Sequence, residues 1–156
     1  MDPQTSSARS ANTMSPRPQS VFPSLAYEDA DRAVEWLAAT FGFEKILNIP
    51  GDGGGILHAE LRTPDGDILM VLSTQHSTRR NRSPRSLGGT AQSVYVATSD
   101  VDGLHQRAAD AGAEIFNPLR NTDYGREFCC LDPEGHIWTF GTYQPDAAPA
   151  GASLDK

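Results

Sequence analysis

Two side chains with chemical capability lie close together in the segment GILHAEL, where His58 stands two residues before Glu60. The segment has the composition of a β-strand, and alternate residues of a strand point to the same face, so the imidazole and the carboxylate lie side by side. Such a pair can bind a divalent metal, exchange protons with a substrate, or line a cleft as ordinary polar residues. The pair alone leaves these alternatives open.

The elements that position this pair are predicted from periodicity and turn residues. Leu57, Ala59 and Leu61 alternate with the pair and form an apolar stripe on the other face of the strand. The first half of the chain predicts a strand at 21–27, a helix bounded by Asp29 and Gly42, and strands at 43–49, 56–63 and 67–73. The second half predicts a strand at 92–99, a helix bounded by Asp100 and Gly112, and strands at 114–119, 126–132 and 136–143.

The order βαβββ therefore occurs twice, and equivalent positions in the two halves lie at a nearly constant spacing. Asp29 and Asp100 are 71 residues apart, Gly42 and Gly112 are 70 apart, and the turns that begin at Pro64 and Pro133 are 69 apart. This agreement indicates an internal duplication. We expect module 1 at 21–73 and module 2 at 91–144.

The remaining segments are polar. Residues 1–20 and 145–156 are rich in small and polar residues and are expected to be disordered tails. The linker at 74–90 carries Arg79, Arg80, Arg82 and Arg85 and no acidic residue. It is predicted to be a solvated mobile loop that is too polar to pack, or alternatively a lid whose arginines contact an anionic ligand.

Composition excludes several classes of protein. A chain of 156 residues with a net charge of −7 is one soluble domain and not a nucleic-acid binder, which needs clustered Lys and Arg. No apolar run approaches the roughly 18 residues that span a membrane, and the N-terminus lacks the apolar segment of a secretory signal. Cys129 and Cys130 are adjacent and predict two reduced thiols, so we expect a cytoplasmic protein.

The duplicated βαβββ unit resembles the vicinal oxygen chelate superfamily, in its glyoxalase and bleomycin-resistance branch. The resemblance covers residues 21–144 and is most specific in YEDADRAVEWLAATFGFE, DVDGLHQRAADAGAEI and LDPEGHIWTFGTY. It implies an α+β fold of two tandem βαβββ modules, whose half-barrels form a cupped cleft with a helix on each convex side. It also implies a homodimer that binds a small molecule in each cleft.

The strand faces opposite the apolar stripes carry the residues expected to line that cleft. With Tyr124 and Arg126, which are placed at its rim, the expected ligand-binding residues are Phe22, Ser24, His58, Glu60, Arg62, Ser93, Tyr95, Tyr124, Arg126 and Thr139.

Metal-using members of this superfamily take His and Glu ligands from four positions, which fall here on Phe22, Glu60, Ser93 and Thr139. Only Glu60 retains a family ligand, and one carboxylate is too few for a divalent ion, so no metal cofactor is expected. His136 is placed on the helix-facing side of its strand and cannot add a ligand. The alternative is a divalent metal such as Zn, Ni, Mn or Fe, with a register error hiding a ligand.

The function implied is the binding of a small, partly aromatic molecule, either by sequestering a drug, as bleomycin-resistance proteins do, or by binding a metabolite. Two enzymatic alternatives stay open: a metal-dependent lyase, isomerase or dioxygenase of the superfamily, and a metal-free acid/base enzyme with Glu60 and His58 as catalytic residues.

Overall fold

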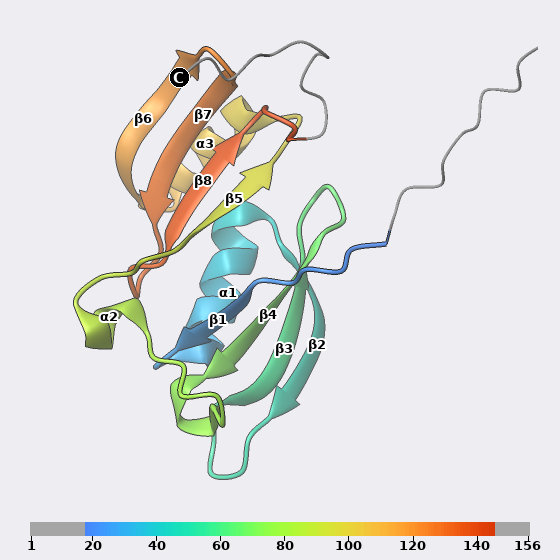
Figure 1. The fold of residues 1–156 in the computed structure, drawn as a ribbon, viewed down its shortest axis with the longest axis vertical. Helices are drawn as coiled ribbons and strands as arrows, with labels where there is room; N and C mark the ends of the chain where they lie inside the picture. The colour runs from blue at the N-terminus through green and yellow to red at the C-terminus, as the bar shows by residue number, and fades with distance from the viewer. Residues whose placement is uncertain (1–17, 146–156) are drawn as a thin grey trace, which may run out of the picture.

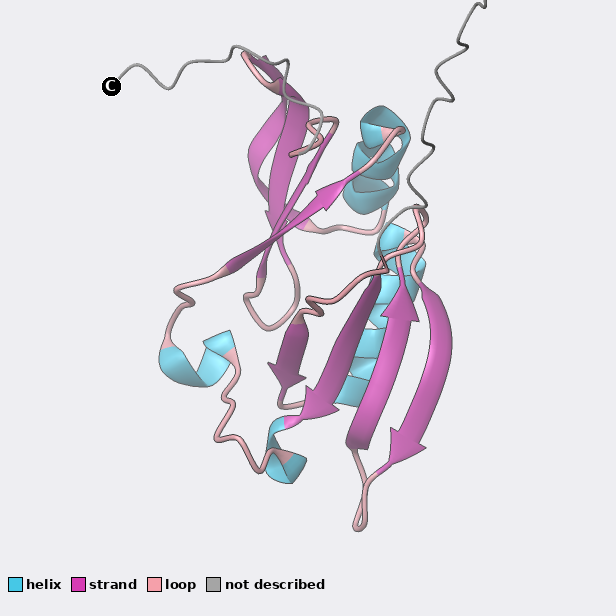
Figure 2. Ribbon diagram, turned by 45° about the vertical axis from the view of Figure 1, so that its right-hand side comes forward, coloured by secondary structure: helices cyan, strands magenta, loops and turns pink. Residues whose placement is uncertain are grey.

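The computed structural model describes residues 18–145 and contains two four-stranded sheets, each with a helix on one face (Figures 1 and 2). The predicted α+β fold with two βαβββ modules is confirmed. The predicted tails at 1–20 and 145–156 lie outside the described residues except for 18–20 and 145. Gln19 belongs to this described part, and its side-chain amide donates to the carbonyl of Ile68 and accepts from the amide of the same residue.

The two modules have the same sheet order. In the first sheet the order is β1-β4-β3-β2, formed by β1 (Ser24–Tyr27), β2 (Glu44–Pro50), β3 (Ile56–Arg62) and β4 (Ile68–Ser73), with helix α1 (Ala30–Phe41). In the second sheet the order is β5-β8-β7-β6, formed by β5 (Ser93–Ala97), β6 (Glu114–Thr122), β7 (Gly125–Leu131) and β8 (Ile137–Gly141), with helix α3 (Val101–Asp110). The first strand of each module is parallel to its last strand and forms one edge of its sheet.

The helix ends follow from the residues predicted to cap them. Asp29 accepts a hydrogen bond from the amide of Arg32 at 3.1 Å, and Asp100 accepts one from the amide of Gly103 at 3.0 Å. Gly42 ends α1 in the left-handed conformation, at φ 73°, which a glycine adopts without strain. These local signals fix both ends of α1 and the start of α3; α3 ends at Asp110 with Ala111 as its C-cap, and the predicted Gly112 follows at φ 74°.

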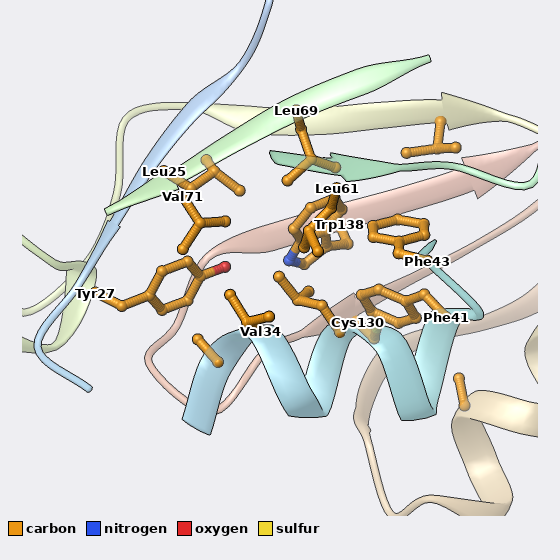
Figure 3. Packing of buried hydrophobic residues seen from close by; sticks show 14 of the residues in the cluster. Leu25, Tyr27, Val34, Phe41, Phe43, Leu61, Leu69, Val71, Cys130 and Trp138 are labelled. Carbon is orange, nitrogen blue, oxygen red and sulfur yellow. The ribbon is translucent and has the colours of Figure 1, made fainter. Parts of the chain in front are cut away.

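One hydrophobic core joins the two modules (Figure 3). Phe41, at the end of α1, lies 4.6 Å from Phe140 and 5.4 Å from Trp138 of β8, measured between ring centroids. These rings are almost fully buried. The helices and the helix-facing sides of both sheets are therefore packed together, and residues 18–145 leave the opposite faces of both sheets uncovered.

A buried polar cluster also crosses between the modules. The hydroxyl of Tyr27 donates to Asp132 at 2.6 Å, and the same carboxylate accepts from the indole of Trp138 at 3.1 Å. The Glu134 carboxylate accepts from the amides of Glu28 and Asp29 just before α1. Burial, followed by the charge of Asp132, raises the pKa of Tyr27 well above its ordinary value.

The linker differs from the expectation that it is too polar to pack. It contains a 3-10 turn, η1 (Thr74–His76), and a short helix, α2 (Pro84–Leu87). Ser83 and Pro84 are buried, and Ser83 caps α2 while its hydroxyl donates to Glu28 at 3.0 Å. Because these polar groups find partners on the first module, the middle of the linker packs against the domain.

The apolar stripe of β3 is interrupted. Ala59 and Leu61 are fully buried, whereas Leu57 is 49% exposed. The register shifts between Ile49 and Pro50 of β2, so that Leu57 has no cross-strand partner and Ile56 takes the buried place. A β-bulge has therefore moved Leu57 out of the predicted stripe.

Candidate functional site

The uncovered side of each sheet, which we call its open face, is defined by strand alternation. In β3, Ala59 and Leu61 point toward α1, so His58, Glu60 and Arg62 point to the open face. Cross-strand register places Ser24, Met70, Glu60 and Leu47 in one row on the first sheet. The equivalent row on the second sheet is Tyr95, Thr139, Cys129 and Asn117.

His58 and Glu60 contact each other on the open face of the first sheet. Nε2 of His58 lies 3.0 Å from Oε1 of Glu60, and each side chain is about a third exposed. An ionised carboxylate only accepts hydrogen bonds, so in this contact His58 donates its proton from Nε2. Nδ1 of His58 and Oε2 of Glu60 have no further hydrogen-bond partner in the described part of the chain, and the carboxylate oxygen is an acceptor. The pair is thus suited to a ligand that donates hydrogen bonds.

A hollow of about 740 Å³ lies between the edge strands β1 and β5 and the linker. It brings together three of the predicted residues, Ser24, Ser93 and Tyr95. Ser24 begins the open-face row of the first sheet on β1, and Tyr95 begins that of the second sheet on β5. Because both residues line the hollow, the hollow adjoins both rows at these edge strands. Glu60 lies two strands away from Ser24, a distance of about 10 Å at the usual strand spacing.

Tyr95 is held in a defined position at this hollow. Its hydroxyl donates to the carbonyl of Tyr143 at 2.9 Å, and its ring lies over Gly141 so closely that a Cβ there would meet the hydroxyl oxygen. Partial burial raises the pKa of Tyr95, so the hydroxyl stays protonated at neutral pH. The residue as a whole is 37% exposed and can contact a ligand.

Two predicted aromatic walls lie elsewhere. Phe22 precedes β1 instead of belonging to it, is 40% exposed and does not line the hollow. Tyr124 lies in the turn between β6 and β7, is 73% exposed and contacts only Tyr143 among the described aromatic rings.

The two predicted arginines differ in position. Arg62 is on the open face and donates to Glu44 of β2 at 2.9 Å. Arg126 is not at the cleft rim as expected: it shares the helix-facing side of β7 with the buried residues Phe128 and Cys130. Its guanidinium donates to Asp102 of α3 at 2.9 Å, and this hydrogen bond lowers the pKa of Asp102.

Several residues at the site were missed by the sequence prediction. Cys129 lies on the open face, 3.3 Å from the hydroxyl of Thr139, a position that alternation with Phe128 and Cys130 would have indicated. His136 precedes β8 and is among the residues that line the hollow; its Nε2 lies 3.0 Å from the carbonyl of Ala26, and its ring centroid lies 4.6 Å from that of the buried Tyr27. Arg82 also lines the hollow; the sequence named it only among the linker arginines of the alternative lid, and the tertiary structure places it there.

The four family metal positions do not have a donor set that fits a divalent ion. They hold the phenyl ring of Phe22, the Glu60 carboxylate, and the hydroxyls of Ser93 and Thr139. A phenyl ring has no lone pair to donate, and neutral hydroxyls are weak ligands compared with imidazole or carboxylate. Within residues 18–145 no group of three His, Cys, Asp or Glu side chains is arranged to hold a metal.

None of the helices in the described part of the chain is long and apolar enough to cross a membrane.

Comparison with known proteins assigns the chain to one family. The Glyoxalase/Bleomycin resistance protein/Dioxygenase superfamily matches residues 20–140. The crystal structure of TioX from Micromonospora sp. ML1 is 37% identical, with a TM-score of 0.67, and the match covers 81% of this chain and 100% of that one. An uncharacterized protein of Mycobacterium bovis is 31% identical over 121 residues, which are 76% of this chain and 80% of that protein.

More distant structures share the fold. A mutant of the fosfomycin resistance protein FosX from Listeria monocytogenes, solved in complex with Mn(II) and 1S,2S-dihydroxypropylphosphonic acid, is 16% identical with a TM-score of 0.57. That match covers 80% of this chain and 90% of FosX.

Proposed function

The chain belongs to the glyoxalase/bleomycin resistance protein/dioxygenase superfamily, and on this premise we propose that it binds a small, partly aromatic molecule in a cleft made of the hollow and the adjoining open faces. The observation that supports this most is the hollow itself. It is large enough for a drug-sized molecule, and Tyr95, which is held by its hydrogen bond to Tyr143, is one of its lining residues. Sequestering a drug and binding a metabolite are the two roles that such a site would serve.

The ligand extends from the hollow onto the first open face in this proposal. Met70 lies between Ser24 and Glu60 in their cross-strand row, and Leu47 lies beyond Glu60 with 40% of its surface exposed. An apolar part of the ligand covers these side chains, and a hydroxyl or amine donates to the acceptors of Glu60 and His58. Ring contact with Tyr95 contributes about 1 kcal/mol beyond the burial of area.

Substitution of Tyr95 tests the location of the cleft. Nile red, a neutral aromatic dye whose fluorescence rises in apolar surroundings, serves as the probe. Tyr95→Ala is expected to weaken its binding about fivefold or more, because the variant loses one aromatic wall. Tyr124→Ala is the matched control, since Tyr124 is exposed and does not line the hollow. Equal affinity of both variants and the wild type would place the binding site elsewhere.

We propose that binding uses no divalent metal at the four family positions, since their donor set does not fit one. Metal analysis of protein purified without chelator tests this point. Less than a tenth of an equivalent of metal is expected, roughly the level of chance contamination for a chain with too few ligands. Near-stoichiometric Zn, Ni, Mn or Fe that disappears in Glu60→Gln would support the metal-dependent lyase or dioxygenase alternative instead.

A metal-free acid/base enzyme is the second candidate, and the His58–Glu60 contact favours it. A carboxylate that orients an imidazole is a common arrangement for proton transfer. Proton exchange at a weakly acidic carbon of a bound ligand, measured by deuterium incorporation and lost in His58→Gln, would support it.

We also propose a homodimer with two equivalent clefts. Members of this superfamily are typically dimers, and here the edge strands β1 and β5 and both open faces are left uncovered by the described residues of one chain. Light scattering during size-exclusion chromatography would show twice the chain mass of 16.8 kDa. A monomeric mass at micromolar concentration would contradict the proposal.

A further inference from the structure

The hollow has an unusual charge for this protein. The chain has 20 acidic and 13 basic residues, yet no Asp or Glu is among the residues that line the hollow. One guanidinium, that of Arg82, lines it together with neutral polar groups such as Gln92 and Ser93. The lining therefore contains no carboxylate that would repel an anion and one guanidinium that would attract it.

The positive charge of Arg82 is not neutralised by a neighbouring carboxylate. In the part of the chain that the structure describes, Arg62, Arg85, Arg120 and Arg126 each lie within 4 Å of an Asp or Glu oxygen. Arg82 has no such partner there, and its one hydrogen bond runs from Nη2 to the carbonyl of Ser86 at 3.2 Å. Most of its donors are therefore free for a ligand.

The linker holds Arg82 beside the hollow. The next residue, Ser83, is fully buried and donates to Glu28, and Arg85 donates to the carbonyl of Pro133 in the second module. Arg82 is thus tethered one residue from a point where the linker is fixed to both modules. A tethered guanidinium loses less conformational entropy on binding than one on a free loop.

Taken together, these features lead us to infer that the ligand carries an acidic group, a carboxylate or sulfonate, that Arg82 binds while the aromatic part of the ligand contacts Tyr95. The inference rests on the proposed function and adds the charge class of the ligand to it. The guanidinium offers paired N–H donors that match the two oxygens of such a group. The Glu60–His58 pair then receives the hydrogen-bond donors at the other end of the same molecule.

Two dyes of different charge test the inference on the full chain. The anionic dye 1-anilinonaphthalene-8-sulfonate carries a sulfonate on an aromatic frame, and Nile red is neutral. Arg82→Gln is expected to weaken binding of the anionic dye about tenfold, since it removes a charge-assisted hydrogen bond, and to change Nile red binding less than about twofold. Raising the salt concentration should weaken the binding of the anionic dye to the wild type more than its binding to Arg82→Gln.

Arg79→Gln is the matched control, because it removes the same charge from the same linker at a residue that does not line the hollow. Unchanged affinity of the anionic dye in Arg82→Gln, or an equal loss in Arg79→Gln, would overturn the inference. A different result would contradict the proposed function itself, namely that Tyr95→Ala leaves the affinity for both dyes unchanged. If Tyr95→Ala weakens the binding of Nile red but Arg82→Gln does not weaken the binding of the anionic dye, the location of the cleft is supported and its preference for anions is contradicted.

Discussion

Removal of the Tyr27 hydroxyl tests the polar cluster that joins the two modules. In Tyr27→Phe the ring remains in the core, but Asp132 loses the hydrogen bond of 2.6 Å and keeps those from the indole of Trp138 and the amides of Glu134 and His136. A hydrogen bond to a charged acceptor contributes about 1.5 to 3 kcal/mol when its partner is buried. We expect the free energy of unfolding to fall by about 2 kcal/mol.

Urea denaturation followed by circular dichroism measures this change. With a denaturant dependence of about 2 kcal/mol per molar urea, the midpoint should fall by about 1 M. Tyr124→Phe is the control, because Tyr124 is exposed and its hydroxyl has no hydrogen-bond partner among the described residues. A loss below about 0.5 kcal/mol in Tyr27→Phe, which is the range of ordinary surface changes, would refute the reasoning.

The same residue predicts a dependence on alkaline pH. Burial and then Asp132 raise the folded-state pKa of Tyr27, so above about pH 10 the unfolded chain loses this proton while the folded chain keeps it. The free energy of unfolding therefore falls as pH rises, by up to about 1.4 kcal/mol per pH unit for one proton. The advantage of the wild type over Tyr27→Phe should shrink above pH 10, and an equal pH dependence of the two proteins would contradict this origin of the shift.

Two further predictions concern residues whose positions the structure defines. Burial, followed by the charge of Asp132, raises the pKa of Cys130 to about 12. In Cys129→Ser protein at pH 8 we therefore expect Ellman's reagent to modify Cys130 only as fast as the protein unfolds. Rapid reaction of the folded protein would show that the thiol is accessible. Arg126→Ala breaks an exposed contact with Asp102 on the helix side, so the affinity for Nile red should stay within about twofold of the wild type. A larger loss of affinity would show that Arg126 contributes to the cleft.

The sequence by itself determined the order of the elements and the face of most strand residues. Both depend on local signals: period-two alternation assigned Trp138 and Phe140 to the core and Tyr95 and Thr139 to the opposite side, as the structure has them. The ends of α1 followed from Asp29 and Gly42 for the same reason, since a cap is made within a few residues of the helix it ends. The side-by-side placement of His58 and Glu60 is also local, because it needs only one regular strand.

What only the tertiary structure decided involves residues that are distant in the chain. The bulge that exposes Leu57 comes from the pairing of β3 with β2, and the packing of α3 against the second sheet supplies Asp102 as the partner of Arg126. Arg82 reaches the hollow because Ser83 finds Glu28 in the first module, 55 residues away in sequence. Periodicity describes which face a residue takes within its own element. Which other element lies opposite that face is set by packing of the whole chain, and the charge and shape of the site depend on that packing.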